Sequence, residues 1–210
     1  MKNLLIIGAR GFGREIYNLA KECEGYNTEF VIKGFLDDNV KALDGYLNYP
    51  PIISSVEDYK PEREDVFICA LGDVYYKKKY VDIILSKGGN FINLIHPTAY
   101  ISSNVEIGIG CIIGRNVQIS CDVKIGNYVT LQVFVDIGHD CIIGDFCHLN
   151  SYTFMGGYVE LEDMVTLHTA SIIHPHKKVE YGGVVGAGAF VIRNVKNNTS
   201  VYGNPAILLK

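Results

Sequence analysis

The chain has 210 residues, 48% of them apolar and 20% charged, which predicts one large or two small packed domains and excludes extended disorder. Its formal net charge of −4, from 19 basic and 23 acidic residues, lacks the basic excess typical of nucleic-acid-binding proteins. No apolar run reaches the roughly 20 residues of a membrane span. The first apolar run, residues 4–7, is too short for a signal peptide, so we expect a cytoplasmic protein.

Residues 1–94 alternate between strand and helix signals. Continuous apolar runs predict buried strands, and residues spaced by three and four predict helices. The predicted strands are residues 4–7, 30–36, 65–71 and 91–95, and the predicted helices are residues 14–20 and 74–86. The order predicts a small parallel α/β sheet, about half of a Rossmann unit, as the first domain, residues 1–94.

Glycines and an acidic residue follow the ends of these predicted strands. They are Gly8, Gly11, Gly13, Asp37 and Gly72. Parallel sheets bind ligands beyond the carboxyl ends of their strands, and a glycine turn lets a phosphate approach the N–H groups that begin a helix. Two interpretations stay open. The glycines and Asp37 either form tight turns only, or bind a nucleotide diphosphate with Asp37 near the ribose.

From Pro97 to Ile192 the sequence divides into sixteen consecutive groups of six residues, or hexads, without one insertion. The fifth position is Ile, Leu, Val or Met in every hexad, and the third is small or β-branched except at Lys177. A six-residue period is the signature of a β-helix. Three hexads form one triangular coil of 18 residues, which gives about five coils with the fifth-position side chains inside. Burying the Lys177 ammonium is costly, so we expect a bulge or an outward turn there.

Six cysteines are distributed over both halves of the chain. They are Cys23, Cys69, Cys111, Cys121, Cys141 and Cys147. None forms a C-x-x-C pair, which weakens zinc and redox interpretations, and we expect reduced thiols in the core.

A glycine turn (Gly8-Ala9-Arg10-Gly11-Phe12-Gly13), a junction (Ile95-His96-Pro97-Thr98-Ala99) and the hexads together resemble one family over essentially the whole chain. This is the sialic acid O-acetyltransferase and nucleotide-amino-sugar N-acetyltransferase family of hexapeptide-repeat proteins. The resemblance implies a left-handed parallel β-helix over residues 95–192 and a C-terminal tail over residues 193–210. It also implies a homotrimer with acetyl-CoA bound between adjacent prisms and a nucleotide-sugar-binding first domain.

The activity that the resemblance implies is acetyl transfer from acetyl-CoA, without a metal. The acceptor is the 4-amino group of a nucleotide-linked, UDP-type 4-amino-4,6-dideoxy sugar in surface glycan biosynthesis. O-acetylation of sialic acid or a related sugar remains an alternative, as does a non-catalytic nucleotide-sugar scaffold. A metal-dependent protein like the prism-shaped carbonic anhydrases would use several histidines, among them His139, His148, His168, His174 and His176. A dehydrogenase is disfavoured, because no second substrate domain follows the glycine turn.

The repeat stacks residues 18 apart, which places Cys121 below His139 and Gly157 above it. A glycine over the imidazole leaves room for the pantetheine arm, and Asp140 can fix the imidazole tautomer. The resemblance implies His139 as general base with Asp140 as its partner, and His148 as a contact to the acceptor sugar. From the residues alone, both histidines are equally well surface side chains.

Further positions are expected, from the resemblance, to bind acetyl-CoA. They are Gly157, Thr169 and Ala187 along the arm, with Gly203 and Pro205 in the tail motif Gly203-Asn204-Pro205-Ala206. The segment around Lys177 departs from the family pattern.

Overall fold

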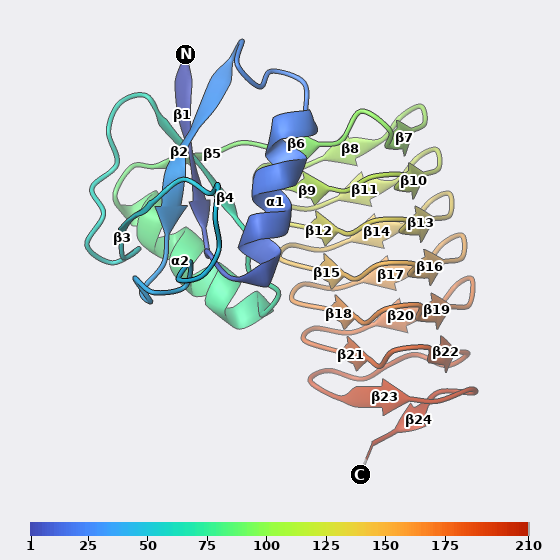
Figure 1. The fold of residues 1–210 in the computed structure, drawn as a ribbon. Coiled ribbons are helices and arrows are strands. Elements are labelled where there is room, and N and C mark those ends of the chain that lie inside the picture. The colour runs from blue at the N-terminus through green and yellow to red at the C-terminus, as the bar shows by residue number, and fades with distance from the viewer. Residues whose placement is uncertain (210) are drawn as a thin grey trace. The chain divides into compact units, whose positions relative to one another are not determined.

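The computed structural model describes residues 1–209, which divide into two compact units with the boundary after Pro97. The first unit is an α/β domain and the second is a β-helix (Figure 1). Neither helix in the described part of the chain is long and apolar enough to cross a membrane.

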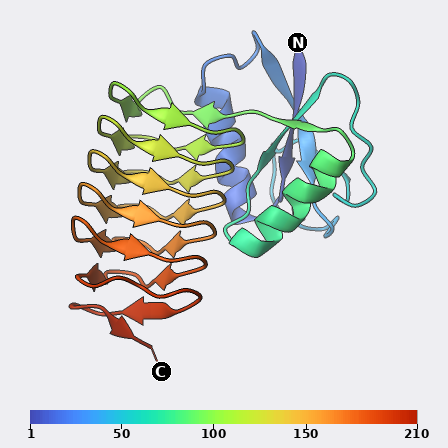
Figure 2. The same ribbon diagram turned by 180° about the vertical axis from the view of Figure 1, so that it is seen from behind.

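A parallel five-stranded sheet forms the centre of the first unit. Its strands lie in the order β3-β2-β1-β4-β5. The strands are β1 (Lys2–Ile7), β2 (Phe30–Leu36), β3 (Ile52–Ser54), β4 (Asp65–Cys69) and β5 (Asn90–Phe91), and the helices are α1 (Gly11–Glu22) and α2 (Val74–Ser86). The helices cover opposite faces, since α1 lies in front in Figure 1 and α2 in the reverse view of Figure 2. The strand order reverses between β1 and β4, which makes the carboxyl ends of these strands a switch point.

The helices follow the predicted periodicity closely. In α1, Ile16, Leu19 and Ala20 are buried, as their spacing predicted. The α2 helix has the predicted bounds and is N-capped by Asp73, whose carboxylate accepts hydrogen bonds from the backbone N–H groups of Tyr75 and Tyr76. Its buried face differs from the prediction in one place, because Leu85 is exposed and Lys77 is buried instead.

Two strand predictions in this half were wrong in detail. The apolar run 91–95 forms two short strands in different sheets, with β5 in the α/β sheet and β6 (Leu94–Ile95) in the β-helix. The three-residue edge strand β3 was not predicted, because so short a segment carries no periodic signal.

Three parallel sheets form the β-helix, and each has one strand per coil. The first contains β6, β9 (Ile112–Ile113), β12 (Thr130–Leu131), β15 (His148–Leu149), β18 (Thr166–Leu167), β21 (Val184–Val185), β23 (Ser200–Tyr202) and the antiparallel β24 (Ile207–Leu208). The second contains β7 (Tyr100–Ile101), β10 (Gln118–Ile119), β13 (Asp136–Ile137), β16 (Phe154–Met155), β19 (Ile172–Ile173) and β22 (Phe190–Val191). The third contains β8 (Glu106–Ile107), β11 (Lys124–Ile125), β14 (Ile142–Ile143), β17 (Glu160–Leu161) and β20 (Lys178–Val179).

Residues 18 apart pair between coils, as the hexad count predicted: Gln118 pairs with Asp136, and Asp136 with Phe154. The fold class is therefore confirmed as an α/β domain followed by a parallel β-helix. The paired strands continue beyond the five coils counted from Pro97, since β6 precedes the first hexad and β23 pairs with β21 after the last.

The second residue of each hexad turns the corner between two sheets. From Asn104 to Gly188 this residue has a positive φ in every hexad, whether it is Asn, Asp, Gly, Ala, Met or an aromatic residue. An aromatic residue rarely adopts this left-handed conformation. The ladder of interstrand hydrogen bonds on both sides therefore overrides the local preference of residues such as Tyr158 (φ 60°).

The interior is filled by the third and fifth positions of the hexads. Three thiols at the third position, those of Cys111, Cys141 and Cys147, are buried and donate to backbone carbonyls of the next coil, 3.1–3.2 Å away. Burial raises the pKa of the Cys141 thiol to about 11. All six cysteines are free, and five are buried as expected, but Cys121 lies at a corner and is half-buried.

The expected bulge at Lys177 is absent. Glu160 and Leu161 pair in register with Lys178 and Val179, and the Lys177 carbonyl accepts the Glu160 N–H at 3.0 Å. The side chain is half-buried, so the ammonium does not have to enter the core. The coil shortens later instead, because Val195 bridges to Val179 after 16 residues.

Candidate active site

A cavity of about 690 Å³ opens at the switch point of the α/β sheet. Its lining comes from the ends of β1, β2 and β4 and from the starts of both helices. The lining residues include the predicted Gly8, Gly13, Asp37 and Gly72. Gly11 is not among them: it begins α1, and a Cβ added to it would meet no atom within 4 Å.

The glycine turn and the end of β2 are joined by the Asp37 carboxylate. Its Oδ2 accepts the Ala9 N–H at 2.8 Å, and its Oδ1 accepts the Asn39 N–H at 2.9 Å. A Cβ on Gly13 would collide with the Gly8 carbonyl oxygen, so only glycine permits this close approach of α1 to β1. Asp37 therefore fixes the turn, and its contact with a ribose stays a prediction.

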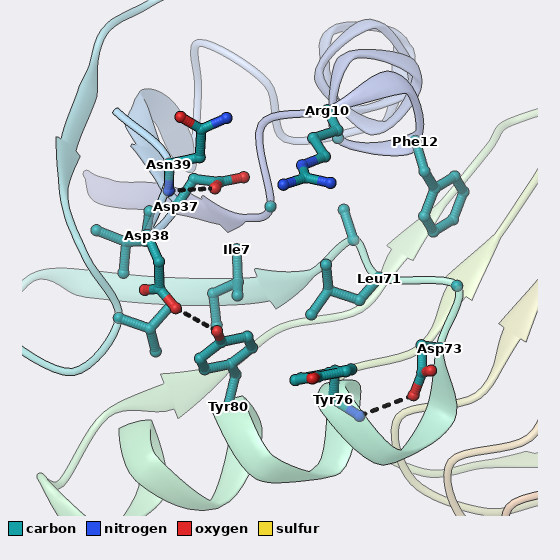
Figure 3. Close-up of a pocket in the computed structure, with 16 residues that line it drawn as sticks. Ile7, Arg10, Phe12, Asp37, Asp38, Asn39, Leu71, Asp73, Tyr76 and Tyr80 are labelled. Atoms are coloured by element: carbon teal, nitrogen blue, oxygen red, sulfur yellow. Dashed lines mark hydrogen bonds between the residues drawn. The ribbon is translucent and has the colours of Figure 1, made fainter. Parts of the chain in front are cut away.

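Three large side chains that line the cavity were not among the predicted site residues. Figure 3 shows Arg10 directed into it from the glycine turn, with Tyr76 and Tyr80 facing it from α2. The two tyrosine rings stack at 6.4 Å, and the Tyr80 hydroxyl donates to Asp38. Burial, followed by this hydrogen bond, raises the pKa of Tyr80 above its usual range. Their spacing of four on α2 was the available signal, because it places both rings on one helix face.

The His139 and Asp140 pair lies at the corner between β13 and β14. His139 is about half exposed, and its Nδ1 lies 2.7 Å from Asp140 Oδ2. Because a carboxylate only accepts, this contact places the imidazole proton on Nδ1 and leaves the Nε2 lone pair available. Asp140 reaches the ring because its own backbone is left-handed (φ 57°).

Gly157 lies against His139, as the 18-residue spacing predicted. A Cβ on Gly157 would stand 2.7 Å from His139 Nε2, so any other residue would displace the ring. Below the pair, Asp122 accepts a hydrogen bond from Asn104 Nδ2 at 2.9 Å. That bond lowers the pKa of Asp122, with a smaller contribution from His139. Two carboxylates therefore contribute negative potential at this corner.

His148 occupies a different environment from His139. It lies on β15 and is only 2% exposed, and its Nε2 lies 3.2 Å from Gln132 Nε2. The interpretation of His148 as a surface histidine is therefore wrong. Its predicted contact with an acceptor sugar stays a prediction.

The predicted acetyl-CoA contacts lie on two different corners. Thr169 and Ala187 stack on the corner that follows the first sheet, whereas Gly157 lies on the His139 corner. Both Thr169 and Ala187 are exposed. Gly203 (φ 93°) and Pro205 lie in the exposed turn between β23 and β24.

Across residues 1–209, no three His, Cys, Asp or Glu side chains converge in the manner of metal ligands. Of the histidines considered for such a site, His174 lies beside the Pro175 carbonyl and His176 stacks on Tyr158.

Comparison with known proteins separates the same two halves. Residues 3–84 match the PglD N-terminal domain, and residues 94–186 match the GMPPB C-terminal domain. The UDP-N-acetylbacillosamine N-acetyltransferase of Bacillus subtilis (strain 168) is 28% identical over 117 residues, 54% of this chain and 51% of that protein. The alignment thus spans about half the length of this curated relative.

Several solved structures match over the whole chain, among them WeeI and PerB. WeeI from Acinetobacter baumannii AYE is 25% identical with a TM-score of 0.89, and each chain is covered completely. PerB from Caulobacter crescentus, solved with CoA and GDP-perosamine, is 22% identical with a TM-score of 0.90, over 100% of this chain and 98% of that one.

The fold and the His139 corner define a hexapeptide-repeat protein with an additional α/β domain that contains a cavity. The comparisons agree with the resemblance of the sequence to the hexapeptide-repeat family of sialic acid O-acetyltransferases and nucleotide-amino-sugar N-acetyltransferases.

Proposed function

We propose that this protein transfers the acetyl group of acetyl-CoA to the 4-amino group of a nucleotide-linked 4-amino-4,6-dideoxy sugar, with UDP as the nucleotide. One observation carries the proposal: an imidazole whose Nδ1 is held by Asp140 while its Nε2 lies against Gly157. The names of the relatives support the substrate class, since one acts on a UDP-linked and another binds a GDP-linked amino sugar. Surface glycan biosynthesis in the cytoplasm is the corresponding setting.

In the proposed mechanism, the neutral 4-amine attacks the thioester carbonyl carbon, and a C–N bond forms as the carbonyl becomes a tetrahedral oxyanion. His139 Nε2 accepts a proton from the nitrogen, which becomes cationic on attack. The intermediate then collapses, the C–S bond breaks, and the proton passes from the imidazolium to the departing thiolate. Asp140 stabilises the imidazolium through Nδ1. The products are the N-acetyl sugar and CoA, and no metal takes part.

The cavity of the first unit would hold the nucleotide of the acceptor. The α1 N-terminus carries no acidic residue in its first turn, and Arg10 makes no side-chain capping bond there. Helix N–H groups and a guanidinium both favour a diphosphate. The Tyr76 and Tyr80 rings offer apolar faces to the nucleoside, and Asp38 offers a hydrogen-bond acceptor.

Acetyl-CoA would lie along the β-helix in a homotrimer. Gly157 stands on one corner and Thr169 and Ala187 stand on another, so one CoA can contact both sets where adjacent subunits meet. Gly203 and Pro205 would contact its other end. The PerB structure, which has the same fold and holds CoA, supports this assignment.

The test is thiol release from acetyl-CoA in the presence of separate acceptors: UDP-linked 4-amino sugars, GDP-linked 4-amino sugars and free sialic acid. We expect thiol release only with a nucleotide-linked amino sugar, and fastest with a UDP-linked one. Release with sialic acid alone would instead establish O-acetylation. Absence of release with every acceptor, combined with tight nucleotide-sugar binding, would establish a scaffold and overturn the proposal. Metal-dependent CO₂ hydration would also overturn it.

A further inference from the structure

Two aromatic rings continue the His139 corner into the following coils. Tyr158 lies directly after Gly157, and its ring centroid is 5.2 Å from that of His139 with the planes at 89°. His176, one coil further, stacks on Tyr158 at 4.8 Å with the planes at 6°. Tyr158 is 50% exposed, so this arrangement is not a consequence of core packing.

The coil spacing imposes this column. Tyr158 and His176 both occupy the second position of a hexad and share a left-handed backbone with φ of 60°. Equivalent residues on successive coils lie about 4.8 Å apart, the distance between strands, which is also a stacking distance for two rings. Phe134 and Tyr152 stack in the same way on another corner, at 5.2 Å and 6°. Two aromatic residues 18 apart at this position therefore support each other.

His139 differs because it occupies the first position, and its ring meets Tyr158 at a right angle. The imidazole is thereby held on three sides, by Asp140 at Nδ1, by the Gly157 backbone at Nε2 and by the Tyr158 ring. The Asp140 bond alone leaves the ring free to swing about it. The Tyr158 contact opposes that swing, and Tyr158 is itself held by His176.

We propose that Tyr158 and His176 are positioning residues for acetyl transfer: Tyr158 holds the His139 ring in its reactive orientation, and His176 holds Tyr158. The inference rests on the proposed function of His139 as general base. Neither ring supplies a proton or touches the acetyl group in this role, so what matters is the flat ring and not the hydroxyl or the imidazole nitrogens.

Steady-state kinetics on the full-length protein test the inference, with acetyl-CoA and the nucleotide-linked amino sugar found active in the thiol-release assay. We expect Tyr158→Ala to lower kcat about tenfold with both KM values within twofold, since small displacements of a catalytic group are costly. We expect His176→Ala to lower kcat about threefold. The ring-preserving variants Tyr158→Phe and His176→Phe should restore kcat to within twofold of wild type, which a specific chemical role would not allow.

Tyr100→Ala is the matched control, because it removes an exposed tyrosine from β7, outside the column, and should leave kcat unchanged. Thermal unfolding of every variant separates loss of rate from loss of fold. His139→Ala is measured in parallel. If His139→Ala is inactive while Tyr158→Ala turns over at the wild-type rate, only the positioning role is overturned and the catalytic proposal stands. If His139→Ala retains full activity, the catalytic proposal and the positioning role are both overturned.

Discussion

Gly157 and His139 form a close backbone-to-ring contact between neighbouring coils: a Cβ on residue 157 would stand only 2.7 Å from Nε2. Residue 157 must therefore be glycine as long as His139 Nε2 occupies its present position. Its backbone needs no special φ, so the constraint is steric and comes from the imidazole.

Replacing Gly157 by alanine tests this relationship. We expect Gly157→Ala to fold normally, because the exposed His139 ring can rotate away from the new methyl group. The displaced Nε2 should then lower kcat by about 10- to 100-fold, since a shift of about 1 Å is enough for such a loss. Ser103→Ala, at the equivalent position of the same corner three coils before Gly157, provides the control. Unchanged kcat in Gly157→Ala would contradict the assignment of Nε2 as the reacting atom.

Removing the imidazole should have the largest effect. We expect His139→Ala to lower kcat by at least ~100-fold with small changes in both KM values, because general-base catalysis typically contributes ~10²–10⁴-fold. Asp140→Asn should cost less, since the base remains while its orientation and charge support weaken. Initial rates at saturating substrates measure both. A folded His139→Ala enzyme that keeps more than about a tenth of the wild-type kcat would refute the assignment.

Arg10 should matter for the acceptor and not for the acetyl donor. We expect Arg10→Ala to raise the KM of the nucleotide-linked sugar about tenfold, in the range for loss of a charge-assisted hydrogen bond, and to leave the KM of acetyl-CoA unchanged. Arg14→Ala, which removes a cation from the same helix outside the cavity lining, is the comparison. An equal rise in both KM values would argue against a nucleotide site in this cavity.

The first unit contains a buried carboxylate whose ionisation should link stability to pH. Burial opposes ionisation of Asp65, but hydrogen bonds from the Tyr59 hydroxyl (2.6 Å), the Glu62 N–H (2.8 Å) and the Lys33 ammonium (3.0 Å) outweigh it and lower its pKa. A group with a lowered folded-state pKa stabilises the fold above its unfolded pKa of about 3.9, and the contribution is lost as pH falls through the folded value.

We therefore expect Asp65→Asn to lower the free energy of unfolding by about 1–3 kcal/mol at pH 7, and the gap from wild type to narrow below about pH 4. Urea unfolding across this pH range measures it. Asp44→Asn, in an exposed loop, should change little at any pH. A gap that stays constant down to pH 2 would show that Asp65 does not titrate as described.

The β-helix should assemble with two further copies of the chain. The contacts expected for acetyl-CoA stand on two corners of one prism, so we expect a homotrimer that completes each site. Equilibrium sedimentation at micromolar concentration should give about three times the monomer mass of 23.3 kDa. A monomer mass under these conditions would exclude sites shared between subunits.

The repeat made the β-helix predictable because one register holds through sixteen hexads, and the register also placed Gly157 over His139. The predicted bulge at Lys177 was wrong. The position of Lys177 in the hexad indicates the core, but a long side chain can extend its ammonium outward from a partly buried position. The position of the cavity could be predicted from Gly8 and Gly72, which follow strands β1 and β4. Arg10 and Tyr80 were missed because only the three-dimensional fold brings the start of α1 opposite a face of α2.

The coil architecture also governs how this half of the chain can change in length. Each coil forms its hydrogen bonds only with the coils on either side, so the addition or removal of 18 residues returns every later side chain to its own corner. A deletion of one or two hexads before His176 would instead move the following residues to a different sheet. His139, Tyr158 and His176 therefore share one corner because every coil up to His176 has 18 residues. The 16-residue coil follows His176, so it does not change their alignment.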